Sequence, residues 1–291
     1  AFIASIILIL LSIGLFFLNG LNFGIDFKGG TLIEIETQNK IEISEVRSSL
    51  NSLSLGDIQV QEFGSDKNLL IRIEQQQGGD QIQQNVLEIV KQKLMNDISE
   101  TINFRRTEVV GPKVSGELIQ SGTIAILVAV FAMLIYIWLR FEWQFSLGAV
   151  IALLHDVILT IGVFCLTQLE FNLPIIAAIL TIVGYSMNDT VVVYDRVREN
   201  LRKFRSKEIT SLLNLSINET LSRTIVTSVT TLLALVSLYI FGGEVIKGFT
   251  FAMIWGVLVG TYSSIFVAAP LLTYLDVKRE WNTTTAVDST K

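Results

Sequence analysis

Residues Leu173–Arg205 read LPIIAAILTIVGYSMNDTVVVYDRVRENLRKFR, an apolar run of membrane-spanning length that ends in a cluster of arginines. About two-thirds of the way along, the apolar run contains Asn188 and Asp189. An aspartate in the middle of a membrane helix costs about 3 kcal/mol, because hydrocarbon cannot solvate its charge. Such acids usually face the interior of a bundle and mark a path for ions or substrates. We therefore predict that the rest of the chain surrounds and serves Asp189.

The composition divides this chain of 291 residues between lipid and water. The hydrophobic fraction of 51% and the mean hydropathy of +0.55 are too high for an ordinary soluble domain. The formal net charge of −5 falls entirely in residues 20–117, which contain 10 basic and 15 acidic residues and so argue against a nucleic-acid partner. One cysteine and one histidine exclude a disulfide framework and a zinc cluster, so no metal or cofactor is expected.

Six apolar runs are each near the roughly 20 residues that a membrane helix requires. The first, within residues 1–19, is interpreted as a spanning helix rather than a secretory signal, because no small-residue cleavage site follows it. Residues 118–275 are predicted to form a five-helix bundle. Its predicted spans are 118–139, 145–166, 173–193, 225–241 and 249–269.

Lysine and arginine residues gather in one set of loops, and this asymmetry predicts the orientation. Residues 194–224 carry seven of them, whereas residues 167–172 carry none. Both termini, including a polar tail at 276–291, are therefore predicted in the cytoplasm, with residues 20–117 on the other side. Within 194–224 apolar residues recur at helical spacing, which predicts an amphipathic cytoplasmic segment lying on the membrane surface.

Residues 20–117 alternate in a way that predicts a small α+β domain. Strands are predicted at Thr31–Thr37, Asp57–Phe63, Asn68–Glu74 and Ile102–Val110. Helices are predicted at Ser44–Leu53 and Asp80–Asp97, the second with an apolar face of Ile82, Val86, Ile89, Val90 and Leu94. The order β-α-β-β-α-β is that of ferredoxin-like domains. The sequence thus predicts a polytopic α-helical membrane protein of six helices, with a ferredoxin-like domain inserted between the first and second.

Three ionisable groups stand out in or at the ends of the spans. Asp156 lies midway along the third span, Asp189 in the cytoplasmic half of the fourth, and Arg223 at the cytoplasmic start of the fifth. Their depth allows Asp189 and Arg223 to meet. A carboxylate that takes up and releases protons is favoured, since Arg223 stabilises its charged form and desolvation its neutral form. The alternative is a static ion pair that holds two helices in register.

Polar neighbours extend this site along the helices. On the fifth span a polar and small stripe is expected to face the bundle interior, formed by Arg223, Thr227, Thr230, Ala234 and Ser237. For Asp156 a structural hydrogen bond to another helix is an equal alternative. His155 adjoins Asp156 in sequence, so the two side chains are expected to point about 100° apart, and His155 is interpreted as a core residue.

Four segments together resemble one family in their order and spacing. They are FGIDFKGGT at 23–31, VGPKVSGEL at 110–118, LLHD at 153–156 and GYSMNDTVVVYDRVREN at 184–200. They are similar to the SecD/SecF family of protein-export membrane proteins, in its SecF branch, which is related to the RND superfamily of transporters. The resemblance covers nearly the whole chain, to about Asp276.

This resemblance implies a non-enzymatic role in bacterial secretion, in the inner membrane, with residues 20–117 in the periplasm. It implies SecD as the partner half and association with the SecYEG channel and its ATPase SecA. Inward proton flow would then help to draw the emerging preprotein across the bilayer. Asp189 and Arg223 match the family's proton-path positions, and Asp156 is carried over with them. The supporting polar face would consist of Asn188, Thr190, Thr227 and Thr230.

Three other functions stay open from the sequence. An intramembrane aspartyl protease would use Asp156 and Asp189, although the residues before Asp189 are Ser-Met-Asn rather than Gly-x-Gly. An RND-like proton-coupled exporter of lipids or small molecules would need a larger outer domain and a second half. A purely structural scaffold predicts that exchanging Asp189 and Arg223 for each other preserves secretion.

Overall fold

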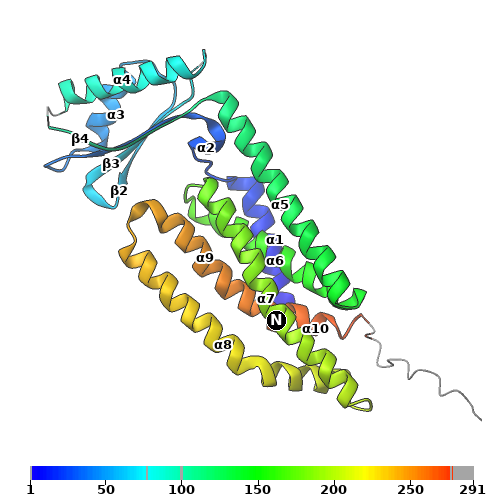
Figure 1. Ribbon diagram of the computed structural model, residues 1–291. Coiled ribbons are helices and arrows are strands. Elements are labelled where there is room, and N and C mark those ends of the chain that lie inside the picture. The colour runs from blue at the N-terminus through cyan, green and yellow to red at the C-terminus, as the bar shows by residue number, and fades with distance from the viewer. Residues whose placement is uncertain (1, 77, 99–100, 276, 278–291) are drawn as a thin grey trace, which may run out of the picture.

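The computed structural model describes residues 2–76, 78–98, 101–275 and 277, arranged as a bundle of long helices with a small sheet domain at one end (Figure 1). Among these residues six helices are long and apolar enough to cross a membrane, so the predicted polytopic helical protein is confirmed. These helices are α1 Phe2–Asn19, α5 Pro112–Arg140, α6 Trp143–Thr167, α7 Leu173–Lys203, α8 Ile209–Phe241 and α9 Glu244–Ser263. The predicted tail at 276–291 lies outside the described residues, except for position 277.

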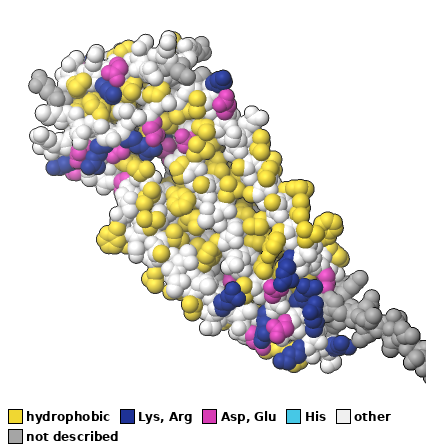
Figure 2. Space-filling model, viewed as in Figure 1, with side chains coloured by type: hydrophobic (Ala, Val, Ile, Leu, Met, Phe, Trp, Pro, Cys, Tyr) yellow, Lys and Arg dark blue, Asp and Glu magenta, His cyan; other side chains and the backbone are white. Residues whose placement is uncertain are grey.

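Helices α6, α7 and α9 form the centre of the bundle. About half of each is buried, whereas only 11% of the most apolar window of α1, α5 or α8 is buried. Glycines allow α7 and α9 to approach closely, because a Cβ atom at Gly256 would lie 2.2 Å from Ile182. Figure 2 shows charged side chains over the sheet domain and at the opposite end of the bundle, with hydrophobic side chains between them. This distribution is the one expected of a bundle that crosses a membrane.

The structure differs from the prediction at residues 194–224, which do not form a separate surface helix. They complete α7 and begin α8, which is continuous to Phe241 and bends in Figure 1 between its first turns and the rest. Hydrogen bonds between α7 and α8 explain why both helices extend into residues 194–224. Arg196 donates to Glu219 at 2.7 Å, and the Asn200 amide donates to Ser216 at 3.0 Å.

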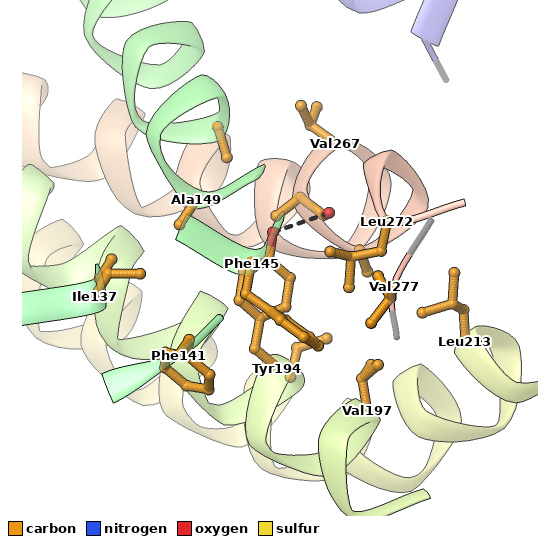
Figure 3. Packing of buried hydrophobic residues seen from close by; sticks show 14 of the residues in the cluster. Ile137, Phe141, Phe145, Ala149, Tyr194, Val197, Leu213, Val267, Leu272 and Val277 are labelled. Carbon is orange, nitrogen blue, oxygen red and sulfur yellow. Dashed lines mark hydrogen bonds between the residues drawn. The ribbon is translucent and has the colours of Figure 1, made fainter. Parts of the chain in front are cut away.

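A buried cluster at this end of the bundle joins α5, α6, α7 and the chain after α9 (Figure 3). Phe145 and Tyr194 pack edge to face with ring centroids 5.2 Å apart. The Tyr194 hydroxyl donates to the Ala268 carbonyl oxygen at 3.0 Å. Ala268 ends a π-helix, Ser264–Ala268, that follows α9 directly and leads into the single turn α10, Ala269–Leu271.

The sheet domain has the predicted element order, β-α-β-β-α-β. Its elements are β1 Gly30–Glu36, α3 Ile43–Asn51, β2 Ile58–Phe63, β3 Ser65–Ile73, α4 Asp80–Asp97 and β4 Asn103–Val110. The four strands are antiparallel in the spatial order β2-β3-β1-β4. Helices α3 and α4 cover one face (Figure 1), where they bury a core of aliphatic side chains.

The buried face of α4 is rotated relative to the prediction. Three of the expected residues are buried, namely Val86, Val90 and Leu94. Ile82 and Ile89 are instead 40% and 47% exposed, and Gln83 is fully buried. The burial of Gln83 is tolerated because its side chain accepts a hydrogen bond from Thr31 at 3.4 Å and donates to the Gln76 carbonyl at 3.2 Å.

A short helix, α2 at Ile25–Lys28, leads from α1 to the sheet through Gly29 and Gly30. Both glycines have positive φ, +71° and +120°. A Cβ atom at Gly30 would lie 2.3 Å from the Ile73 carbonyl oxygen. This turn therefore requires glycine, both for its backbone angles and for its close approach to β3.

Candidate functional site

Asp189 lies inside the bundle on α7, as its position in the apolar run predicted. Its residue is only 8% exposed. Carboxylate atom Oδ1 accepts a hydrogen bond of 2.7 Å from the Thr224 hydroxyl on α8. Atom Oδ2 is buried and has no hydrogen-bond partner among the described residues. One carboxylate oxygen of Asp189 is therefore hydrogen-bonded, and the other is buried without a partner in the described structure.

Arg223 does not form the expected salt bridge with Asp189. The arginine is exposed, and no salt bridge or hydrogen bond joins it to the carboxylate in the described part of the chain, so a longer-range attraction remains between the two. Adjacent residues of a helix point about 100° apart. Because Thr224 faces Asp189, Arg223 necessarily points away from the bundle of this chain.

The polar stripe predicted on α8 is correspondingly wrong by one residue. Its members Thr227, Thr230, Ala234 and Ser237 are all exposed. The hydroxyls of Thr227 and Thr230 bond to carbonyls of their own helix, at 3.0 and 2.8 Å. The buried stripe is Ser216, Thr220, Thr224 and Ser228. The charged residue Arg223 was predicted to face the interior, whereas the side chains that are buried there carry neutral hydroxyls.

The two residues that flank Asp189 point in different directions. Asn188 is exposed, while Thr190 is buried with its hydroxyl 2.9 Å from that of Ser264. Thr190 is therefore the member of the predicted supporting face that lies within the interior. Ser264 is the first residue of the π-helix.

Asp156 is completely buried at the centre of α6 and is surrounded by donors from three helices. Its Oδ2 atom accepts hydrogen bonds from Ser186 on α7, at 2.5 Å, and from Ser263 on α9, at 2.8 Å. Its Oδ1 atom lies 2.9 Å from His155 Nδ1. The expected divergence of His155 and Asp156 is thus corrected. Their Cβ atoms diverge, but imidazole and carboxylate extend far enough beyond them to meet.

His155 is a core residue, as predicted, and it stacks on Tyr262 of α9 with ring centroids 6.1 Å apart. Its Nε2 atom is buried without a hydrogen-bond partner among the described residues. Among the described residues, the two buried acids therefore have separate hydrogen-bond partners, and these two sets adjoin where Ser263 and Ser264 follow each other. No polar role was predicted for these serines, although they end a run of four polar residues, Thr-Tyr-Ser-Ser at 261–264, in the last span.

The start of α7 is fixed to the sheet domain. The Asp26 carboxylate on α2 accepts a hydrogen bond from the Leu173 backbone N–H, at 2.8 Å, and so caps this helix. Beside it, Arg72 of β3 forms a salt bridge of 2.8 Å with Glu170, and both side chains are largely buried. The loop between α6 and α7 also exchanges backbone hydrogen bonds with residues 22–24.

A cavity of about 360 Å³ lies between the sheet and the turn that joins α8 to α9. Its lining mixes apolar side chains with both signs of charge, including Arg106, Glu108, Glu244 and Lys247.

Within the described part of the chain, no group of three or more His, Cys, Asp or Glu side chains is placed to hold a metal ion. The buried carboxylates of Asp156 and Asp189 both accept hydrogen bonds from hydroxyls, an arrangement of groups that can bind and release protons.

Comparison with known proteins agrees with the motifs. The model of the family "Protein export membrane protein SecD/SecF, C-terminal" matches residues 90–278, and that of the "SecD/SecF GG Motif" matches residues 14–41. A protein translocase subunit SecF from Rickettsia bellii is 49% identical over 275 residues, 94% of this chain and 90% of that protein. One from Cereibacter sphaeroides is 50% identical over 266 residues, 89% of this chain and 82% of the relative.

A crystal structure of SecDF from Thermus thermophilus, described as a translocon-associated membrane protein, superposes with a TM-score of 0.83 at 36% identity. The match covers 93% of this chain but 37% of the SecDF chain, so this protein corresponds to about a third of that molecule. The family model spans more than half of the sequence and the SecF relatives match along nearly all of it. The chain therefore belongs to the SecD/SecF family of protein export membrane proteins.

Proposed function

We propose that this chain works as a SecF-type subunit in protein export and that Asp189 takes up and releases protons that flow down the membrane gradient. The names of its relatives support the export role. The observation that carries the proton step is the buried Asp189 carboxylate, with Oδ1 held by Thr224 and Oδ2 without a partner in the described structure. A proton can be added to Oδ2 without breaking a hydrogen bond.

The available driving force is sufficient for such a step. One elementary charge that crosses 100 mV releases about 2.3 kcal/mol. This free energy shifts a two-state equilibrium by roughly fifty-fold. Protonation of Asp189 also removes the charge that attracts Arg223. We infer that α7 and α8 then change their relative positions, with Asp156 as a second buried acid on the proton path.

The exposed face of α8 supports a partner half. Arg223, Thr227 and Thr230 form an outward-facing polar stripe that begins at the predicted start of the span and continues two turns into it. A second bundle that supplies polar groups would cover them. We assign this face to a SecD-type partner, in keeping with the correspondence of this chain to only part of the SecDF molecule.

The contacts at the start of α7 support transmission to the sheet domain. Asp26 and the Arg72–Glu170 pair join this domain to the helix that carries Asp189. We assign the domain a ferredoxin-like fold, a periplasmic location and contact with the emerging preprotein at the SecYEG channel, which SecA drives. Both termini then lie in the cytoplasm of a bacterium, and residues 20–117 lie outside its inner membrane.

The test uses the full chain with its SecD-type partner and the Sec channel in inverted membrane vesicles. Asp189→Asn is expected to abolish the stimulation of preprotein export by an imposed proton gradient, and with it the associated proton flux. Asp195→Asn is the matched control, because Asp195 is an exposed carboxylate on the same helix that pairs with Arg140 at 2.7 Å. Undiminished flux in Asp189→Asn would refute the proposal.

The other functions are less well supported. Asp156 and Asp189 bond to different hydroxyls, so the paired acids that a protease needs are not supported. Because Asp189 and Arg223 form no salt bridge among the described residues, exchanging them no longer tests the scaffold alternative. Asp189→Asn tests it instead, because the amide oxygen still accepts the Thr224 hydrogen bond: a scaffold would keep its response to the gradient, whereas a proton carrier would lose it.

A further inference from the structure

Two consecutive serines connect the buried acids at the point where α9 becomes a π-helix. The Ser263 hydroxyl lies 2.8 Å from Asp156 Oδ2. The Ser264 hydroxyl lies 2.9 Å from that of Thr190, the residue that follows Asp189 on α7, and the Asp189 Oδ2 atom has no hydrogen-bond partner among the described residues. Both serine residues are completely buried. Short π-helical segments are rare and frequently occur at functional sites.

Both serine hydroxyls share one alternative acceptor, the carbonyl oxygen of Gly260. Ser263 Oγ lies 3.1 Å from this oxygen and Ser264 Oγ lies 2.9 Å from it. A hydroxyl has one proton to donate, and a carbonyl oxygen has two lone pairs. One of these lone pairs is occupied by the Ser264 backbone N–H. A single position is therefore left for two hydroxyls.

We propose that Ser263 and Ser264 are positioning residues that couple the protonation of Asp156 to that of Asp189 through competition for the Gly260 carbonyl. While Asp156 is charged, Ser263 donates to it and Ser264 occupies the carbonyl. When Asp156 binds a proton, its carboxyl group no longer requires the hydrogen bond from Ser263. The Ser263 hydroxyl then turns to the Gly260 carbonyl oxygen. Ser264 is displaced toward Asp189 and stabilises its charge. The inference rests on the proposed proton uptake by Asp189.

The consequence is that the two acids resist being neutral at the same time. A proton on Asp156 weakens proton binding at Asp189, and linkage requires the reverse effect to be equal. Such a pair binds its protons in succession rather than together. Alternation of this kind keeps one charge in the bundle throughout a cycle.

Other groups face the two acids, and none of them supplies the same connection. Beside Asp156 these are His155 on its own helix, Tyr262 behind that ring and the Ser186 hydroxyl of α7. Near Asp189 they are Thr224 and the more distant Arg223 of α8. Two further phenols of α7 are directed elsewhere, Tyr185 to Thr231 and Tyr194 to Ala268.

The test is a double-mutant cycle on the pH profile of gradient-driven export by the complete complex in vesicles. Asp156→Asn mimics the neutral acid, so the Asp189-dependent midpoint is expected to move about one pH unit lower. Part of this shift is simple charge removal. In the Ser263→Ala and Ser264→Ala backgrounds the competition is absent, and Asp156→Asn should give a smaller shift, equal in both.

Thr250→Ala is the matched control, since Thr250 is a buried residue of α9 whose hydroxyl donates to the Ile246 carbonyl of its own helix, at 2.8 Å. This variant should leave the full shift in place. The same Asp156→Asn shift with and without either serine would overturn the coupling. If Asp189→Asn leaves the pH profile of the native chain unchanged, it is the proposed function that fails.

A reciprocal measurement covers the case in which Asp156→Asn does not assemble. Infrared spectroscopy of the purified complex in lipid follows the band of protonated carboxyl groups as a function of pH. Asp189→Asn should move the titration of Asp156 to lower pH in the native background. In the Ser264→Ala background this movement should shrink, and an undiminished movement would contradict the proposal.

Discussion

At the scale of single residues, the hydroxyl that faces Asp189 sets how readily this acid binds a proton. Thr224→Val keeps the shape of the side chain and removes the 2.7 Å hydrogen bond to Oδ1. A charged carboxylate loses more from this change than a neutral one, because hydrogen bonds to charged groups are worth about 1.5–3 kcal/mol. Asp189 should then keep its proton to higher pH. The pH midpoint of gradient-driven export is expected to rise by about one unit.

Thr220→Val is the control for this prediction. Thr220 lies one turn before Thr224 on α8, is buried as well, and its hydroxyl donates to the Ser216 and Ile217 carbonyls of its own helix. Its pH profile should match that of the native chain. A midpoint that moves equally in both variants would mean that Thr224 acts through the helix and not through Asp189.

The sequence was sufficient to predict that Asp189 lies inside the bundle, but not which side chains contact it. An acid within a long apolar run is conspicuous because its burial is costly. Which hydroxyls solvate it depends on the rotation of α8, and a helix with polar residues on two faces does not reveal that rotation. Arg223 appeared to be the natural partner because of its charge, whereas the structure places Thr224 there. No polar role was predicted for Ser263 and Ser264, because serine is common in membrane helices.

At the scale of elements, α7 depends on a cap that comes from another part of the chain. Asn172 precedes the helix but makes no side-chain cap hydrogen bond, and Asp26 supplies one instead. Asp26→Ala should lower the free energy of unfolding by about 1 kcal/mol, since it removes both the acceptor and a negative charge at a helix N-terminus. Thermal unfolding in detergent would show a lower midpoint.

Two variants make this prediction specific. Asp26→Asn keeps an acceptor without the charge and should recover part of the loss. Asp66→Ala removes an exposed acid from β3 of the same domain and should be neutral. An Asp26→Ala midpoint equal to that of Asp66→Ala would show that the cap contributes nothing to stability.

Elements were predicted well where one pattern dominates. The long apolar runs gave six helices, and alternation gave the strands of the sheet domain to within a few residues. Prediction failed where several faces of a helix are similar, as on α4, which buries Gln83 in place of Ile82. It also failed at 194–224, because Arg196 and Asn200 find partners on α8 that extend both helices beyond the apolar region.

At the scale of the whole molecule, the sheet domain is joined to the start of α7 by a salt bridge and by the Asp26 cap. The Arg72–Glu170 pair joins β3 to the loop before α7 at 2.8 Å, with the side chains 12% and 22% exposed. Arg72 also lies within hydrogen-bond distance of Asn22, at 3.5 Å, in the segment that follows α1. Removing one partner of a sheltered ion pair leaves the other charge unpaired and poorly solvated. The loss of stability is then larger than the contribution of about 0–1 kcal/mol that an exposed ion pair makes.

Charge exchange across this pair tests whether it transmits motion. Arg72→Glu places two carboxylates together and should separate the sheet domain from the loop, so that proton flux continues while export loses its response to the gradient. Arg72→Glu combined with Glu170→Arg restores an attractive pair and should recover most of that response, although the fork of the guanidinium then approaches from the other side. Arg105→Glu, which disrupts a more exposed pair with Glu36 on the same sheet, is the control and should retain the response.

Because flux and export are measured in the same vesicles, a loss of both in Arg72→Glu would place this pair in the proton path itself. Retention of both would mean that the sheet domain receives its motion by another route.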